Sequence, residues 1–222
     1  MGKNSQVERI VIAIDGVSAS GKTKLTTELA KHYNLPYLLT GNLYRTLALK
    51  LLQHDLSALT ANELATSIAS IKTEDLESDD LKSDIISVSA SKIAKDPLVR
   101  ELLSQYQKDW IALHKMSIVE GRDIGTVIYP KAQIKLFITA SPEIRAKRRW
   151  QELIETKSDT HYQSVLENLK NRDSEDQNRK IAPLQQANDA VVIDTTDKTV
   201  ENMIDTAIKI IEKKIDNIPY TV

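Results

Sequence analysis

The sequence contains no cysteine, and this absence removes several kinds of chemistry. Without thiols the chain can form neither disulfides nor cysteine-ligated zinc or redox centres, which is typical of a cytosolic protein. No apolar run approaches the roughly 18 residues of a transmembrane helix, and the polar start MGKNSQVER has no apolar signal region. We therefore expect a cytoplasmic protein that is not attached to a membrane.

An excess of positive charge is also lacking. The 222 residues include 30 Lys and Arg against 31 Asp and Glu, so the formal net charge is −1. A nucleic-acid-binding protein would usually be basic, and we expect no nucleic-acid partner. The length suits a single domain over residues 1–222, and nothing in the sequence demands more than a monomer.

Glycine is scarce, yet two of the six glycines stand five residues apart in GVSASGKT, residues 16–23. This stretch follows the apolar run RIVIAID and precedes KLTTELAKHY, which has the apolar spacing of a helix. A strand, then G-x-x-x-x-G-K-[ST], then a helix is the signature of a phosphate-binding loop, called the P-loop below. An ordinary strand-to-helix turn is the alternative interpretation.

The residues of the P-loop have a direct physical interpretation. Gly16 and Gly21 allow the backbone to wrap so that successive N–H groups point at a phosphate, which the positive end of the following helix also attracts. Lys22 is expected to reach the β- and γ-phosphates of ATP, and Thr23 to offer its hydroxyl to Mg²⁺. The sequence therefore predicts Mg²⁺ with ATP as the cofactor.

Strands and helices alternate along the chain, which predicts an α/β fold with a parallel sheet flanked by helices. The expected strands cover residues 9–15, 37–39, 117–120, 134–139 and 190–194. The expected helices cover residues 22–33, 42–53, 61–70, 85–94, 97–114, 142–156, 162–179 and 200–215. Residues 72–84 (KTEDLESDDLKSD) form an acidic, mostly polar connection, which we call the acidic connector.

Arginine is distributed unevenly, since only Arg9 precedes the P-loop. Arg122 follows an expected strand directly in EGRDIGT, so we assign it to the ligand-binding edge of the sheet. Arg145 and Arg148 share a helix face, although a solvent-exposed charged face is the alternative for Arg145. Phosphoryl transfer needs water excluded, and residues 155–163, between two arginine-bearing helices, are the expected mobile lid.

Several longer stretches, taken in order, resemble the bacterial cytidylate (CMP) kinases, a family of nucleoside monophosphate kinases. They are IAIDGVSASGKT, TGNLYR, SASKIAKDPLVR, the stretch 119–149 that begins VEGRDIGT, and the stretch 172–196 that begins RDSEDQNRKIAPL. Together they cover most of the chain, and they are more specific than the P-loop alone. The resemblance implies a three-layer P-loop kinase fold. It also implies direct in-line phosphorylation of CMP, and of dCMP, by ATP in pyrimidine nucleotide metabolism.

The resemblance also implies roles for individual residues. The ATP phosphates would be bound by Gly16, Val17, Ser18, Ala19, Ser20, Gly21, Lys22, Thr23 and Lys24. The catalytic residues would be Lys22, Arg122, Arg179 and Arg148. The acceptor would be bound at its phosphate by Thr40, Arg45 and Arg179, at cytosine by Ser91, Arg100 and Asp123, and at ribose by Arg172 and Asp176. An acidic acceptor and an arginine donor suit cytosine, which presents an amino group beside two acceptors.

Three residues have structural alternatives. Ser91 is small enough to be a helix-packing residue, and Asp123 could pair structurally with Arg122 or Arg100. Tyr44, in TGNLYR, is more readily a core residue than one that stacks on a ligand.

The sequence also departs from the family at several positions. Leu39 precedes TGNLYR where the family usually has Asp, Lys24 replaces a common small hydroxyl residue, and Lys82 stands where Arg is usual. The acidic connector is too short and acidic for the β-hairpin insert that the family typically has in its monophosphate-binding lobe. We therefore expect a reduced lobe over about residues 41–114. The core would cover about residues 9–40, 115–150 and 180–215.

Other functions were weighed against this one. A P-loop kinase for another small acceptor, such as shikimate, would not need the set Ser91, Arg100 and Asp123. A GTPase-like switch would need a guanine-reading N-K-x-D motif, which the sequence lacks. A non-catalytic domain is disfavoured because Lys22 and Thr23 are intact.

Overall fold

The computed structural model describes residues 9–52, 54, 59–155 and 160–216. The chain divides into two compact units, which are described separately below. Unit 1 comprises the chain up to Tyr37 and from Lys115 onward, and unit 2 comprises Leu38–His114. Residues 156–159, in the middle of the expected lid, lie outside the described residues. Within the described ranges, no helix combines the length and the apolar character needed to cross a membrane.

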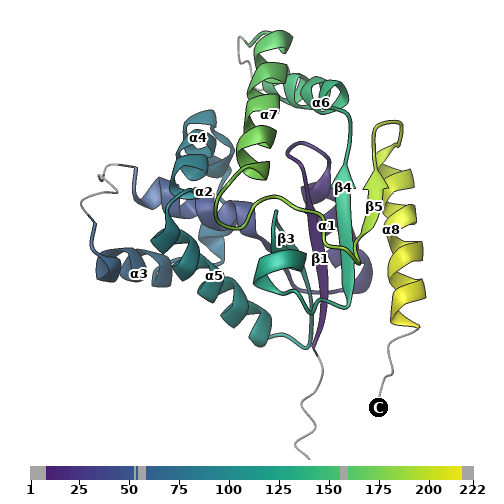
Figure 1. Ribbon diagram of the computed structural model, residues 1–222, viewed down its shortest axis with the longest axis horizontal. Coiled ribbons are helices and arrows are strands. Elements are labelled where there is room, and N and C mark those ends of the chain that lie inside the picture. Colours follow the sequence, from purple (N-terminus) through teal and green to yellow (C-terminus); the bar gives the residue numbers. More distant parts are fainter. Residues whose placement is uncertain (1–8, 53, 55–58, 156–159, 217–222) are drawn as a thin grey trace, which may run out of the picture. The chain divides into compact units, whose positions relative to one another are not determined.

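Unit 1 is built on a parallel sheet, which confirms the predicted α/β class (Figure 1). Strand β1 (Ile10–Gly16) pairs in parallel with β3 (Met116–Glu120) on one side and with β4 (Ile134–Thr139) on the other. β4 in turn pairs with β5 (Val191–Asp194), and β2 (Tyr37–Leu39) completes the order β2-β3-β1-β4-β5. Every residue of β1 is buried, so the P-loop leaves the sheet at its most enclosed strand.

One face of this sheet is covered by two helices, α1 (Lys22–Tyr33) and α8 (Val200–Ile215). Both begin and end where the sequence predicted. Their apolar side chains join those of the strands in one core, which includes Ile12, Ile14, Leu25, Leu29, Ile118, Ile134, Leu136, Met203, Ala207 and Ile211. This core fixes the end of β1 against the start of α1, and therefore fixes the two ends of the P-loop.

Gly16 is the last residue of β1, and no other residue type fits there. Its φ is +145°, and a Cβ atom would lie 2.0 Å from the carbonyl oxygen of Ile138 on β4. The first glycine of the P-loop is therefore required by close backbone packing as well as by its dihedral angle.

Helices α6 (Pro142–Glu155) and α7 (Tyr162–Gln177) pack on each other through a small core of their own. Trp150 on α6 fastens the pair at the end near the expected lid. Its indole Nε1 donates to the carbonyl oxygen of Thr160 at 2.9 Å, and its ring meets that of Tyr162 edge-on, with centroids 6.2 Å apart.

The described residues of unit 2 include four α-helices. They are α2 (Thr40–Lys50), α3 (Ala61–Ala69), α4 (Asp84–Ile93) and α5 (Pro97–Ala112). The acidic connector forms two 3₁₀-helices, η2 (Glu74–Glu77) and η3 (Asp79–Lys82), which the sequence analysis did not predict. Among the described residues of unit 2, none after β2 is in a strand, which agrees with the expectation that the connector is not a hairpin.

A π-helix, η4 (Ile124–Ile128), follows β3 and was also not predicted. Its wide turn is closed by the N–H group of Ile128, which donates to the carbonyl oxygen of Asp123 at 3.1 Å, and by that of Tyr129, which donates to Ile124 at 2.7 Å. Single π-turns are rare and occur frequently at functional sites. Here the turn begins directly after Arg122 and Asp123, two of the predicted site residues.

Candidate active site

The P-loop forms a concave backbone surface at the start of α1. Gly16, Ala19 and Gly21 all have positive φ, at 145°, 55° and 92°. Gly21 is the N-cap residue of α1, and it has no side chain that could accept hydrogen bonds from the first N–H groups of the helix. In contrast, a side chain caps the start of each of the helices α3, α4, α5 and α8. The free N–H groups and the positive end of the helix dipole are suited to bind an anion such as phosphate.

Lys22 is buried beneath this surface, with 4% of its area exposed. Its Nζ donates to the carbonyl oxygen of Val17 at 2.5 Å and lies 3.4 Å from Ser20 Oγ. Burial, and next the positive charge of Arg122, lower the pKa of Lys22 to about 7. The ammonium group is thus held at the loop in an environment that lacks sufficient negative charge, which a triphosphate would supply.

Thr23 and Glu120 form a pair of oxygen groups beside the loop. Thr23 Oγ1 donates to Glu120 Oε2 at 3.0 Å, and Glu120, the last residue of β3, is 7% exposed. Hydroxyl and carboxylate oxygens are ligands that Mg²⁺ accepts, so this pair fits the predicted metal. Thr23 was predicted from the sequence and Glu120 was not, although an acidic residue at the end of a buried strand, directly before GRDIGT, was the available signal.

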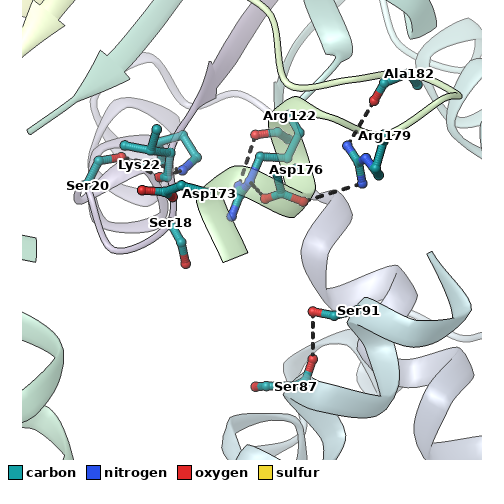
Figure 2. Close-up of polar contacts among 12 residues, drawn as sticks. Ser18, Ser20, Lys22, Ser87, Ser91, Arg122, Asp173, Asp176, Arg179 and Ala182 are labelled. Carbon is teal, nitrogen blue, oxygen red and sulfur yellow. Dashed lines mark hydrogen bonds and ion pairs between the residues drawn. The ribbon is translucent and has the colours of Figure 1, made fainter. Parts of the chain in front are cut away.

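Arg122, Asp176 and Arg179 form a chain of ion pairs at the end of α7 (Figure 2). Arg122 Nε donates to Asp176 Oδ2 at 3.1 Å, and Arg179 Nη1 lies 3.6 Å from Asp176 Oδ1. Arg179 Nη2 also donates to the carbonyl oxygen of Ala182 at 2.9 Å. Burial alone would raise the pKa of Asp176, but the charges of Arg122, Arg179 and Arg172 outweigh it and hold the pKa below its ordinary value.

These contacts bring three predicted residues of unit 1 together, Arg122, Asp176 and Arg179. The positive charges of Arg122 and Arg172 both act on Lys22, so the arginines gather near the P-loop. Asp176 is shared between two arginines in this structure, and its predicted contact with ribose stays a prediction.

Arg145 is a buried link between the P-loop and α7, so the alternative of an exposed charged face is wrong for it. The side chain is 3% exposed. Its Nη1 donates to the carbonyl oxygen of Ser18 at 3.2 Å, its Nη2 to Asp173 Oδ2 at 2.7 Å, and its Nε to the carbonyl oxygen of Ala140 at 2.9 Å. The guanidinium group therefore holds the shape of the loop from behind.

Arg148 contacts the loop that follows β5. Its Nη1 donates to Thr195 Oγ1 at 3.0 Å and its Nη2 to the carbonyl oxygen of Thr195 at 2.6 Å. Thr195 Oγ1 in turn donates to the carbonyl oxygen of Ser20 in the P-loop at 3.1 Å. Thr195 therefore links Arg148 to the P-loop backbone. The catalytic role of Arg148 stays a prediction.

Asp15, the residue before Gly16, organises the loop that carries Arg122, and the sequence analysis missed it. Its Oδ1 accepts the N–H group of Ile124 at 2.9 Å and its Oδ2 that of Gly125 at 2.8 Å, at the start of η4. Burial raises the pKa of Asp15 to about 6, even though these two amides act in the opposite direction. An acidic residue at the end of an apolar strand was the only sequence signal.

The raised pKa predicts how stability depends on pH. Because the folded pKa of about 6 lies above the ordinary aspartate pKa of 3.8, the stabilisation from protonating Asp15 is complete below pH 3.8 and is lost as the pH rises through about 6. We expect the free energy of unfolding of the wild type to fall relative to Asp15→Asn by about 3 kcal/mol across that window. Urea unfolding of both proteins at intervals from about pH 4 to 7 measures this difference. Parallel curves would contradict it.

Two predicted acceptor residues lie at the start of α2 in unit 2. Thr40 is the first residue of the helix and is buried. Arg45 folds back over the first turn, because its Nη1 donates to Asn42 Oδ1 at 3.1 Å and lies 3.5 Å from where a Cβ atom of Gly41 would be. The N-cap residue is Leu39, which has no polar atom to cap the helix. A phosphate would find N–H groups and a guanidinium group together here.

The three residues predicted to bind cytosine are divided between the units. Ser91 on α4 donates to the carbonyl oxygen of Ser87 at 3.1 Å (Figure 2). Arg100 on α5 is 4% exposed, and its guanidinium carbon lies 5.9 Å from the centre of the Tyr44 ring, so Tyr44 packs against protein. Asp123 belongs to unit 1, where it is buried directly before η4. Their binding of cytosine stays a prediction.

Comparison with known proteins agrees with these features. The sequence model of the cytidylate kinase family matches residues 12–213. The cytidylate kinase of Brucella suis biovar 1 is 40% identical over 95% of this chain and 96% of its own. That of Caulobacter sp. (strain K31) is 38% identical over 91% and 94%.

Among solved structures, an uncharacterised protein from Eubacterium ventriosum (TM-score 0.50, 18% identity, 94% of this chain and 99% of its own) shares the fold. A Thermus thermophilus protein shares it too, with a TM-score of 0.52 and 16% identity over 94% of this chain and 98% of its own. The P-loop in its strand and helix, the arginine chain beside it and the match over nearly the whole length lead to one conclusion: the chain belongs to the cytidylate kinase family.

Proposed function

We propose that this protein transfers the γ-phosphoryl group of ATP directly to the phosphate of CMP, and of dCMP, with Mg²⁺ as cofactor. Family membership supports the ATP-dependent phosphorylation of CMP to CDP. The observation that carries the mechanism is the arrangement around the P-loop. A buried lysine and a hydroxyl–carboxylate pair lie at one concave backbone surface. The charge of Arg122, which belongs to the chain of ion pairs with Asp176 and Arg179, acts on that lysine.

The proposed roles on the ATP side follow from charge and geometry. The uncapped start of α1 binds the phosphates, and Lys22 leaves the carbonyl oxygen of Val17 to contact the β- and γ-phosphates. Thr23 and Glu120 hold the metal, Thr23 through its hydroxyl and Glu120 through its carboxylate. When bound, Mg²⁺ neutralises charge on the phosphate oxygens.

The transferring phosphoryl group needs positive charge and correct position rather than a protein nucleophile. Arg122 supplies both, because Asp176 holds its Nε and leaves one edge of the planar guanidinium group for phosphate oxygens. Arg179 is held by the same carboxylate and acts as the second positive group. Asp15 supports the arrangement from below by fixing the backbone after Arg122.

The remaining proposed roles concern the acceptor nucleotide. Thr40 and Arg45 bind the CMP phosphate. The buried Asp123 carboxylate accepts a hydrogen bond from the amino group of cytosine, and Arg100 donates hydrogen bonds to the acceptor atoms of the base. The nearly balanced charge of the chain supports small-molecule substrates rather than nucleic acid.

An acceptor series tests this function. In a coupled assay of ADP release with Mg·ATP, we expect fast turnover of CMP and dCMP and little of AMP or GMP. Turnover of UMP should be far slower, because its 4-oxo group would face the Asp123 carboxylate. Equal rates on CMP and UMP would contradict the role of Asp123, and no turnover of any nucleotide would contradict the function.

The same assay tests Asp123 directly. Asp123→Asn should lower kcat/KM for CMP by roughly tenfold to a hundredfold, since the amide offers the cytosine amino group a weaker acceptor and adds a donor. It should lower the rate on UMP much less, so the preference for CMP over UMP shrinks. An unchanged preference would assign Asp123 to structure alone.

A further inference from the structure

Asn42 joins the predicted phosphate-binding arginine to the acidic connector within unit 2. Its Oδ1 accepts from Arg45 Nη1 at 3.1 Å, and its Nδ2 donates to the carbonyl oxygen of Leu76 in η2 at 2.9 Å. The chemistry of the partners fixes the orientation of this amide, because a guanidinium group only donates and a carbonyl oxygen only accepts. One side chain therefore bridges the connector and Arg45.

The connector is fastened to the same face of α2 at two further points. Thr46 Oγ1 donates to the carbonyl oxygen of Asp75 at 3.2 Å, and Lys50 Nζ lies 3.1 Å from Asp75 Oδ2. Asn42, Thr46 and Lys50 are spaced four residues apart and so form one stripe along the helix. The pKa of Asp75 lies below its ordinary value because its carboxylate accepts the N–H group of Lys72 and a hydrogen bond from Lys50.

We propose that Asn42 is a positioning residue that presets Arg45 for the acceptor phosphate, with the acidic connector as its anchor. This inference rests on the proposed role of Arg45 in binding the CMP phosphate. Arginine has a long side chain whose free rotation opposes binding, so holding it over Gly41 before CMP arrives favours phosphate capture. Leu39 contributes no polar side-chain atom at this helix start, which increases the dependence on Arg45.

The test measures initial rates against CMP and against ATP for Asn42→Ala. We expect the KM for CMP to rise about fivefold to tenfold, with the KM for ATP changed by less than about twofold and kcat by less than about threefold. Inhibition by cytidine, which has no phosphate, should be unchanged because the effect passes through Arg45. An equal loss of cytidine binding would overturn the proposal, since it would indicate a general disturbance of the lobe.

Thr46→Val is the matched control. It removes one fastening of the connector on the same stripe but leaves the bridge from Leu76 through Asn42 to Arg45 intact. The KM for CMP should stay within about twofold of the wild type. A rise equal to that of Asn42→Ala would overturn the assignment to Asn42 and attribute the effect to docking of the connector.

A double-mutant cycle with Arg45→Met completes the test. Once Arg45 is absent, adding Asn42→Ala should raise the KM for CMP by less than about twofold, because its only expected path of action is gone. Additive effects would overturn the proposal. Failure of the proposed function would give a different result, because the wild type would then not phosphorylate CMP at all. An active wild type with an unaltered Asn42→Ala variant would refute only this inference.

Discussion

Lys22→Met is expected to lower kcat/KM for CMP phosphorylation by about 10³-fold. In the proposed mechanism, Lys22 brings charge to the β- and γ-phosphates, and this charge is needed most when the phosphoryl group is between donor and acceptor, so most of the loss should appear in kcat. Methionine has a similar length and keeps the apolar part of the buried side chain. Steady-state kinetics with CMP and Mg·ATP measure the effect.

The same variant should not lose stability, which would separate the proposed catalytic role of Lys22 from a structural one. The pKa of Lys22 is lowered to about 7 by burial and by Arg122, so the folded protein disfavours its charge. Removing that charge should leave the free energy of unfolding at neutral pH unchanged or raise it by about 1 kcal/mol. Lys31→Met, an exposed lysine on the same helix, should change neither quantity. An unstable Lys22→Met protein would contradict this account.

Arg122→Lys is expected to lower kcat by about 10²-fold although it preserves the charge. Lysine cannot reproduce the fork that donates from Nε to Asp176 and from Nη1 to the carbonyl oxygen of Gly121. In the proposed mechanism, the same guanidinium group also contacts phosphate oxygens. The loss therefore measures the contribution of orientation. Initial rates at saturating CMP and ATP give kcat directly.

Two further measurements sharpen this expectation. Arg9→Lys, at an exposed arginine directly before β1, is the control and should keep the wild-type rate. Asp176→Asn should produce a partial loss, because Arg122 keeps its charge and its contact with Gly121 but loses a charged partner. If Arg122→Lys kept more than half of the wild-type kcat, positive charge alone would suffice at this position.

The regular elements were predictable because their signals are local. Apolar spacing located α1, α8 and β4 to the residue, and a proline at the first position marked the start of α5. The P-loop was predictable for the same reason, since its glycines and lysine are read within eight residues.

The contacts that position the site were not predictable, because they join distant parts of the chain. Asp15 accepts hydrogen bonds from backbone amides more than a hundred residues away. The sequence around Asp15 does not indicate that its partners lie at the start of a π-helix. Arg145 sits among Glu143, Lys147 and Glu152 in a helix that looks charged on all sides. Only the fold shows that the carbonyl oxygen of Ser18 and the carboxylate of Asp173 enclose it.

The contact between Trp150, Tyr162 and Thr160 gives the protein an optical reporter of its own. The chain has two tryptophans, and the other, Trp110, lies on α5 of unit 2 against His114. In a Trp110→Phe protein, the tryptophan fluorescence would therefore come from Trp150 on α6 alone. Emission from Trp150 depends on the hydrogen bond of its indole and on the neighbouring tyrosine ring, both of which join α6 to the chain entering α7. A titration with nucleotide, followed at a single wavelength, would record whether those two helices stay fastened during the catalytic cycle.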